Sequence, residues 1–523
     1  MSSPGLNSYD EVPYDARPRY ATHPDCLATL ARLLGMKPAP VERCRVLELG
    51  CSTGGNLLPL AESLPGSEFV GIDLSPRQIE TGNKVAAALQ LNNLRLEARS
   101  ILDVGPEFGQ FDYIIAHGVY SWVPNEVRDK ILAICQQNLA PQGVAYVSYN
   151  TYPGWYMRAG VCDLINYHTR NLGDAAERIH EARTILEVMR KGIPEPDSAW
   201  GRTFRDEDDL LQREGDYYLF HEHLESHNQA VYFHQFIEHA QQHRLQFLGE
   251  AHIHTILSVF PQEVQQQLRR VCRDLLDLEQ YLDFLKNRSF RRTLLVHADV
   301  VLDRNPGPEV AEGLLAVGMA RPVSAQADLA AGVVEEFVNE AGSTVSTNVP
   351  FAKAALVLLY EQWPRAFNIE ELWHQVQERL GDAAPDFTPA QARGMMTRSL
   401  VHLYLSGLAA LHTYLPAATL EAGDRPQTTP LIRLQARTGA LVTNRRHKEV
   451  PLTAFDRAVL SQCDGQQGRD AIIDVIAAQA QSEKVELRRE GKPLTDPGEI
   501  RAALAPEVHA ALDRLAHSLL LIA

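Results

Sequence analysis

This sequence predicts an α/β fold, with a mainly parallel sheet near the N-terminus and mainly helical domains after it. Short apolar runs alternate with segments of helical period between residues 45 and 150, which is typical of parallel strands joined by helices. A glycine-rich corner at 50–55 joins the first strand to the first helix. After about residue 305 the helical period dominates.

The first 150 residues contain eight expected elements. Strands are expected over 45–50, 67–75, 94–100, 111–118 and 143–150. Helices are expected over 54–64, 76–91 and 125–140. The second helix has the clearest start, because Ser75 suits the N-cap and Pro76 suits the first turn.

Two further strands are expected to complete a seven-strand sheet. Segment 231–256 has the pattern of a helix followed by a strand, and 290–300 has the pattern of one more strand. The helical stretch over about 156–230 would then be an insertion that caps the carboxyl end of the sheet. Segment 262–287 is expected to form one amphipathic helix.

Two stretches mark domain boundaries. Residues 305–332 are rich in Gly, Pro and Ala, and a second breakpoint falls at 421–430. We therefore divide the chain into 1–305, 306–420 and 421–523. The second domain has three or four helices that end in a short strand, an order that suits a winged helix, and the third has the pattern of a small α+β domain.

Composition narrows the classes of function. The formal net charge of −16 does not suit non-specific nucleic-acid binding, because phosphates require Lys and Arg. Seven scattered cysteines indicate a reducing compartment. No signal peptide is visible, and no apolar run approaches the ~18 residues that cross a bilayer. We expect a cytoplasmic protein without a membrane partner.

The corner after the first strand has the spacing E-x-G-x-S-x-G, from Glu48 through Gly50 and Ser52 to Gly54. Glycines there let the backbone turn tightly and approach a ligand, and the following helix offers free N–H groups. The spacing is neither G-x-G-x-x-G nor a P-loop. Asp73 ends the second strand, where a carboxylate can accept both hydroxyls of a ribose or, alternatively, cap the next helix.

These motifs, with FDYIIAHGVYSWVP (111–124) and GVAYVSYN (143–150), resemble the methyltransferases that use S-adenosylmethionine (SAM) and have a Rossmann-like seven-strand sheet. SYDEVPY (8–14), SYNTYPGW (148–155) and a regulatory-type segment at about 215–300 are similar to bacterial methyltransferases with a methyltransferase regulatory domain. That group includes protein-lysine methyltransferases. The resemblance implies SAM as the cofactor and S-adenosylhomocysteine as the product.

The cofactor-binding residues that the resemblance implies are Glu48, Gly50, Ser52, Gly54, Asp73, Leu74, Ser100, Ile101 and His117. The glycines and Ser52 would pack against the methionine part of SAM. Glu48 would hold its amino end, and His117 would lie near the sulfonium.

The remaining residues of this set belong to the nucleoside. Asp73 would bind the ribose, and Leu74 would flank the adenine. The family usually has an aspartate after the third strand, but this sequence has Ser100 followed by Ile101. The adenine amine would then be held by Ser100, by Asp103 or by water.

Aromatic residues follow the fourth and fifth strands, at the edge of the sheet where ligands bind. The acceptor-site candidates are Tyr120, Trp122, Asn150, Tyr152 and Trp155. Rings there can exclude water and attract cationic groups, and Asn150 can hydrogen-bond the nucleophile. The alternative is that Tyr149, Tyr152 and Trp155 are core packing.

Two other features do not support a site. His239 and His243 are one helical turn apart, but no H-E-x-x-H motif and no cysteine accompanies them, so no metal is expected. Arg445, Arg446 and Lys448 form one basic cluster. Because residues 306–523 carry more acidic than basic residues, DNA reading is not expected.

The sequence therefore predicts a SAM-dependent methyltransferase whose acceptor is a protein lysine side chain. A small-molecule acceptor, such as a natural product or a sugar, is the first alternative. The second is a catalytically idle SAM-binding regulatory protein. A homodimer is a further option. Every cofactor motif precedes residue 125, so 306–523 is expected to be dispensable for SAM binding.

Overall fold

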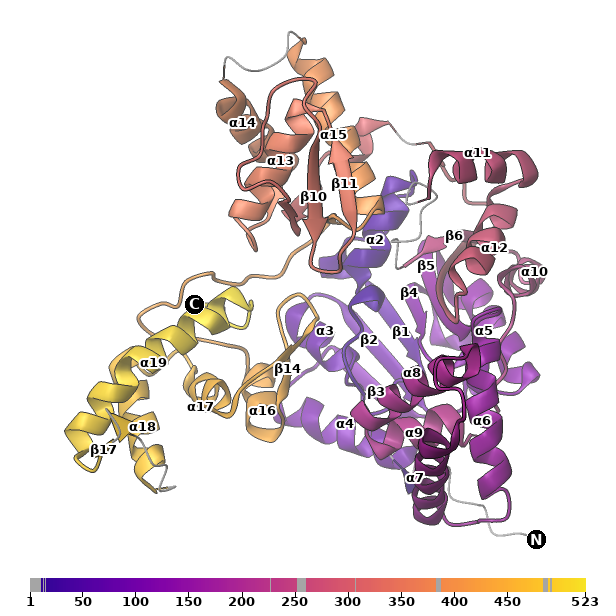
Figure 1. The fold of residues 1–523 in the computed structure, drawn as a ribbon, viewed down its shortest axis with the longest axis horizontal. Coiled ribbons are helices and arrows are strands. Elements are labelled where there is room, and N and C mark those ends of the chain that lie inside the picture. The colour runs from indigo at the N-terminus through magenta and orange to yellow at the C-terminus, as the bar shows by residue number, and fades with distance from the viewer. Residues whose placement is uncertain are drawn as a thin grey trace.

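The structure is a computed structural model, and it describes residues 11–523 except 13, 15, 226, 252–259, 306, 382–386, 483–487 and 490–491. Figure 1 shows a central sheet with helices around it, a second group of elements around α13, α14 and α15, and a third group that ends in α19. The motif at 8–14 and the end of segment 231–256 lie partly outside the described residues.

A seven-stranded sheet with strand order β3-β2-β1-β4-β5-β7-β6 organises the N-terminal part. Its strands are β1 (Arg45–Leu49), β2 (Glu68–Asp73), β3 (Leu94–Ala98), β4 (Phe111–Ala116), β5 (Leu139–Asn150), β6 (Leu245–Glu250) and β7 (Phe290–His297). β1 to β5 pair in parallel, and β7 is antiparallel to both neighbours. The predicted Rossmann-like sheet is confirmed, and the order reverses between β1 and β4, where such sheets bind ligands.

Helices cover both faces of this sheet because its buried strands alternate their side chains between two cores. The helices are α2 (Pro24–Leu33), α3 (Leu57–Ser63), α4 (Pro76–Ala88), α5 (Asn125–Asn138) and α10 (Phe233–Gln242). Val46 of β1 packs on the side of α2 and α3, and Leu47 packs on the side of α5 and α10. Ser75 accepts a hydrogen bond from Gln78 N and caps α4 as predicted.

The segment predicted as one helix over 262–287 forms two, α11 (Gln262–Val271) and α12 (Leu275–Lys286). The prediction was wrong about continuity because the Asp274 side chain accepts from the backbone N–H of Asp277. An aspartate used in this way starts a new helix.

The predicted helical insertion consists of α6 (Trp155–Thr169), α7 (Ala175–Gly192), α8 (Ala199–Arg213) and α9 (Asp216–His223). These helices share a core of their own, which includes Val161, Leu186 and Phe204. Because β5 runs directly into this insertion, the four helices gather at the carboxyl end of the parallel strands (Figure 1).

The middle part is less helical than predicted. Four strands occupy the region 315–347: β8 (Leu315–Gly318), β9 (Ala320–Pro322), β10 (Glu335–Asn339) and β11 (Thr344–Thr347). They precede α13 (Pro350–Glu361), β12 (Phe367–Asn368), α14 (Ile369–Leu380), α15 (Pro389–Leu405) and β13 (Ala409–His412). The small residues of β8 looked like a linker, but they allow α13 to pack closely: a Cβ on Gly318 would lie 2.2 Å from that of Leu359.

The last part contains α16 (Pro430–Thr438), β14 (Leu441–Thr443), β15 (Glu449–Pro451), α17 (Ala454–Gln462), α18 (Arg469–Ser482), β16 (Arg488–Arg489), β17 (Lys492–Pro493) and α19 (Pro497–His517). The start of this part, which has the apolar pattern of a short strand in the sequence, forms the helix α16. It is helical because Thr429 accepts a hydrogen bond from Ile432 N and Pro430 occupies the first turn. The division at 305 and 420 remains a proposal.

Both C-terminal parts contact the sheet domain. The Asp25 carboxylate of α2 accepts from the backbone N–H groups of Thr413 and Tyr414 at 2.6 and 2.9 Å. Leu431 packs against Leu58 and Ala86. No helix among the described residues combines the length and apolar character that a membrane crossing needs.

Candidate active site

The corner between β1 and α3 has the backbone conformation that its glycines predict. Gly50 and Gly54 have φ of +76° and +74°, where residues with a Cβ are strained. A Cβ on Gly50 would also lie 2.6 Å from a methyl carbon of Val119, which follows β4. The glycines therefore keep two loops of the carboxyl edge in close contact.

Asp73 at the end of β2 binds this corner. Its Oδ2 accepts from Ser52 N at 2.8 Å, and its Oδ1 accepts from Ser75 N at 2.9 Å. Ser75, not Asp73, is the N-cap of α4. The capping alternative therefore does not account for Asp73, whose carboxylate lies beside the glycine corner.

Glu48 is a buried carboxyl group beneath the corner. Its Oε1 accepts from Asn56 Nδ2 at 2.9 Å, whereas Oε2 is buried and has no hydrogen-bond partner. Burial raises the pKa of Glu48 to about 8. A buried carboxyl oxygen without a partner suits a ligand that brings a donor or a positive charge.

The edge beyond β2 and β3 contains the residues expected near adenine. Leu74 is 63% exposed, which is unusual for a leucine and leaves its side chain available to a ring. Asp73 pairs with Ala98 in the sheet, so Ser100 follows at the same edge. The Ser100 hydroxyl accepts from Leu102 N at 3.2 Å and caps the short helix Ile101–Asp103. Its role toward adenine stays a prediction.

His117 lies at the end of β4. Its Nδ1 is 2.9 Å from Tyr146 Oη and 3.3 Å from Ser148 Oγ, which accepts in turn from Gly118 N. Burial holds the pKa of His117 well below its usual value, with Arg19 and Arg292 acting in the same direction. The imidazole is therefore neutral at physiological pH.

The aromatic turn after β5 divides into two environments. Tyr149 stacks on Phe236 with ring centres 4.1 Å apart, and Tyr120 and Trp155 are likewise buried. This arrangement matches the core-packing alternative for Tyr149 and Trp155. Trp122 is half-buried and meets Trp155 edge to face at 6.5 Å. That Tyr120, Trp122 and Trp155 line the acceptor site stays a prediction.

Tyr152 is the half-exposed ring of the turn. It stacks on Tyr156 with ring centres 4.1 Å apart and lies 5.3 Å from the ring of Tyr232. Asn150 is buried, and its Nδ2 lies 3.3 Å from Asn228 Oδ1. Tyr152 and Asn150 keep their predicted acceptor-side roles as proposals.

Sequence reasoning missed a contact between the C-terminal part and the cofactor corner. His447, in the turn between β14 and β15, places Nε2 2.8 Å from Asn56 Oδ1. Asn56 is the residue that donates to Glu48. No sequence signal connects positions 391 residues apart, so only the fold reveals this pair.

Comparison with known proteins identifies three regions of the chain. A methyltransferase domain matches residues 47–145, a predicted methyltransferase regulatory domain matches 215–297, and the C-terminal winged helix domain of PKMT matches 424–520. RP789, an uncharacterized protein of Rickettsia prowazekii (strain Madrid E), is 34% identical over 99% of this chain and 94% of its own.

The structure of PKMT2 from Rickettsia typhi is similar over 98% of this chain and 100% of PKMT2, with a TM-score of 0.84 and 30% identity. A second structure of PKMT2, in complex with AdoHcy (S-adenosylhomocysteine), matches with the same values.

The chain belongs to the PKMT family of SAM-dependent methyltransferases.

The cofactor of this PKMT-family enzyme is SAM, and the corner fits it. Gly50 and Gly54 leave a cradle that a Cβ would fill, since one on Gly54 would lie 3.0 Å from Leu96. The partnerless oxygen of Glu48 matches an ammonium group. We propose that Glu48 holds the amino end of SAM and that Asp73 binds its ribose.

The pKa of Glu48 gives a test by pH. An ammonium group binds the ionised carboxylate better, so SAM binding should tighten as pH rises from about 6.5 toward 8.5, through the raised pKa of about 8. Calorimetry of AdoHcy binding at several pH values measures this. A Glu48→Gln variant should bind more weakly and lose this part of the pH dependence. An identical pH profile in both proteins would contradict the role of Glu48.

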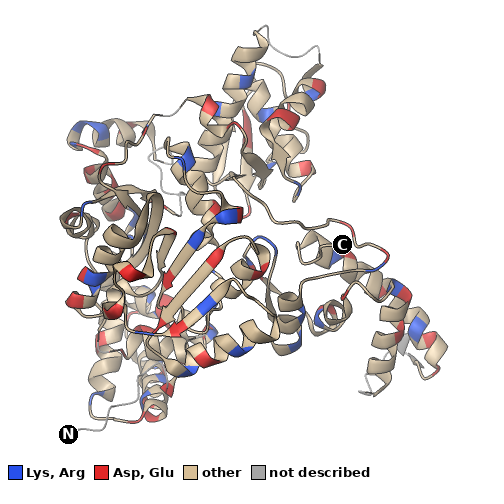
Figure 2. Ribbon diagram, turned by 180° about the vertical axis from the view of Figure 1, so that it is seen from behind, with Lys and Arg blue, Asp and Glu red and all other residues tan. Residues whose placement is uncertain are grey.

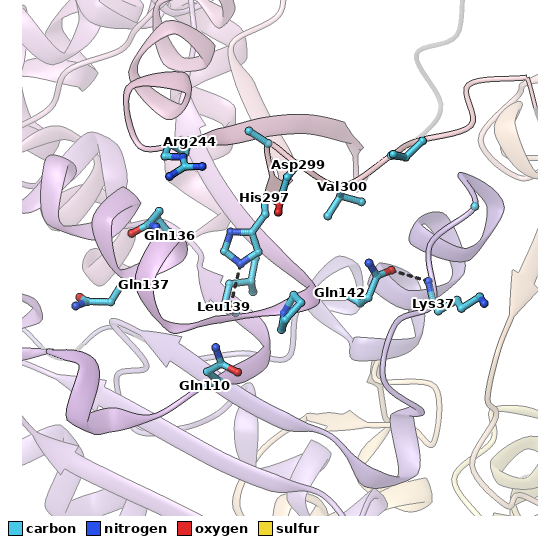
Figure 3. Close-up of a pocket in the computed structure, with 14 residues that line it drawn as sticks. Lys37, Gln110, Gln136, Gln137, Leu139, Gln142, Arg244, His297, Asp299 and Val300 are labelled. Carbon is cyan, nitrogen blue, oxygen red and sulfur yellow. Dashed lines mark hydrogen bonds between the residues drawn. The ribbon is translucent and has the colours of Figure 1, made fainter.

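A cavity of about 820 Å³ lies away from the β1–α3 corner. Figure 3 shows its lining, where His297 Nε2 lies 2.9 Å from Leu139 O and Lys37 N donates to Gln142. Leu139 begins β5, so this cavity is at the opposite end of the parallel strands from Asn150. It is not the cofactor site.

Proposed function

We propose that this enzyme transfers the methyl group of SAM to the ε-amine of a protein lysine. The observation that carries the proposal is similarity to PKMT2 along the whole chain, including the C-terminal winged helix. PKMT denotes a protein lysine methyltransferase.

Bound SAM supplies an electrophilic methyl group next to a positive sulfonium. The chain's own contribution is positioning, because in-line displacement needs aligned partners more than covalent help. Glu48 and Asp73 would hold the two ends of the cofactor. The neutral His117 adds no positive charge to the carboxyl edge, so it does not oppose a cationic ligand there.

The acceptor amine must lose its proton before it can attack. Aromatic rings can assist at two stages. Their faces attract the ammonium form of the lysine as it approaches. Burial among rings then lowers the pKa of the lysine, which favours loss of the proton. Tyr152, Tyr156 and Tyr232 form a surface of such rings, with the hydroxyls of Tyr156 and Tyr232 3.4 Å apart. We propose that the acceptor lysine enters along these three rings.

The proposed entry surface predicts a specific kinetic effect. Tyr152→Ala should lower turnover on the protein acceptor about tenfold and leave AdoHcy affinity unchanged, because a cation–π contact is worth roughly 0.5–2 kcal/mol. Tyr167→Ala, which removes an exposed tyrosine on the same helix as Tyr156, is the matched control. Equal turnover of both variants would exclude Tyr152 from the acceptor path.

The acceptor itself is found by labelling. Full-length enzyme, isotope-labelled SAM and bacterial extract are incubated, and the products are digested for mass spectrometry. Methylated lysine in a protein supports the proposal. Label confined to small molecules would establish the first alternative, and absence of S-adenosylhomocysteine release would establish the idle binder.

The setting of the reaction follows from composition. We propose that the enzyme works in the cytoplasm, where its seven cysteines remain reduced thiols. Figure 2 shows basic and acidic residues interleaved along the C-terminal elements, which favours a protein partner over nucleic acid.

A further inference from the structure

Three side chains converge between α5 and the end of α10. Asp129 projects from α5, and His239 and His243 lie one turn apart at the end of α10. Asp129 Oδ1 is 3.3 Å from His239 Nε2 and 2.8 Å from His243 Nε2. Within the described part of the chain, this is the group whose ligand atoms could share one metal ion.

The donor set and spacing suit zinc. Zinc takes imidazole nitrogen and carboxylate oxygen at about 2.0–2.2 Å in a tetrahedron, which places neighbouring ligand atoms ~3.3 Å apart. The two distances from Asp129 are within about half an ångström of that edge. The three groups fill three corners, and water can fill the fourth because Asp129 is 61% exposed.

The surroundings of His239 add a second observation. Its Nδ1 lies 2.8 Å from Tyr120 Oη, so a hydrogen bond on one ring nitrogen orients the other toward Asp129. Metal-bound histidines regularly have such a partner on the second nitrogen. The site also lies at the C-terminus of α10, whose dipole favours a cation.

We propose that Asp129, His239 and His243 bind one Zn²⁺ ion. The sequence pattern did not indicate this site because the third ligand, Asp129, lies 110 residues before His239 and on another helix. The ion joins α5, in the region that matches a methyltransferase domain, to α10, in the region that matches the regulatory domain. Through Tyr120 it also steadies residues 117–122, whose Val119 touches the glycine corner.

The test uses full-length, untagged protein freed of metal by a chelator. Zinc binding is measured by equilibrium dialysis with elemental analysis, and Co²⁺ serves as an optical probe of geometry. We expect one zinc per chain at micromolar metal and the intense visible bands of tetrahedral Co²⁺. Asp129→Asn and His243→Gln should each weaken binding at least tenfold. His374→Gln, which removes an exposed histidine from α14, should not.

Circular dichroism separates loss of a ligand from loss of the fold, and the exposed Asp129 makes its variant the safer of the two. Absence of stoichiometric zinc in the wild type would overturn the proposal. So would zinc uptake that both variants retain, or a preference for another metal without tetrahedral Co²⁺ bands. In those cases the cluster is a hydrogen-bonded link between two helices.

Discussion

Asp73→Ala should weaken binding of SAM and AdoHcy by ~2–4 kcal/mol, or roughly 30- to 1,000-fold, because two ribose hydrogen bonds to a charged acceptor are lost. The same carboxylate also accepts from Ser52 N and Ser75 N. Its loss therefore also loosens the backbone around Ser52, which has φ of +51°.

Calorimetry with AdoHcy measures this effect. Asp163→Ala removes an exposed carboxylate from α6 and serves as the matched control. Asp73→Asn keeps the shape of the side chain and removes its charge, so it should fall between the alanine variant and the wild type. Unchanged affinity of the alanine variant would remove Asp73 from the cofactor site.

His447→Ala should raise the KM for SAM about tenfold and lower thermal stability, with a smaller effect on kcat. The buried imidazole is within hydrogen-bond distance of Asn56 Oδ1, and Asn56 donates to Glu48 Oε1. Losing a buried partner costs about 1–3 kcal/mol. Because Asn56 Oδ1 also accepts from Arg19 N at 2.9 Å, the Glu48 carboxyl group should be held less firmly toward the ammonium group rather than released.

His517→Ala supplies the control, since His517 is exposed at the end of α19. Normal KM for SAM in His447→Ala, with only its stability lowered, would show that the contact is structural. The contact also argues against the expectation that 306–523 is dispensable for SAM binding. A fragment of residues 1–305 should bind SAM more weakly than the whole chain.

Local patterns predicted the sheet well. Val46 and Leu47 pack on opposite faces of β1, and the short apolar run that contains them is the signal of a buried parallel strand that can be read directly from sequence. The four strands over 315–347 escaped prediction because they are only three to five residues long, and β8 also contains small residues that are typical of a linker. In β8, close packing of Gly318 against Leu359 of α13 rather than local propensity stabilises the extended conformation.

In the candidate site, too, some residues could be predicted from local patterns and others could not. Glu48, Gly50 and Asp73 lie in one short, ordered motif, so their convergence follows from the strand–turn–helix pattern. His447 and Asp129 join their partners only through tertiary packing. The aromatic turn was ambiguous because buried and exposed rings alternate within a few residues, as Tyr149 and Tyr152 do.

The position of His447 has a consequence for biosynthesis. A ribosome makes the glycine corner early, but His447, which contacts Asn56, follows it by 391 residues. A nascent chain, or a fragment cut within the β14–β15 turn before His447, therefore contains every cofactor motif but lacks the His447–Asn56 contact. Such products should therefore bind SAM more weakly than chains that have folded past His447, and they should compete less well for it.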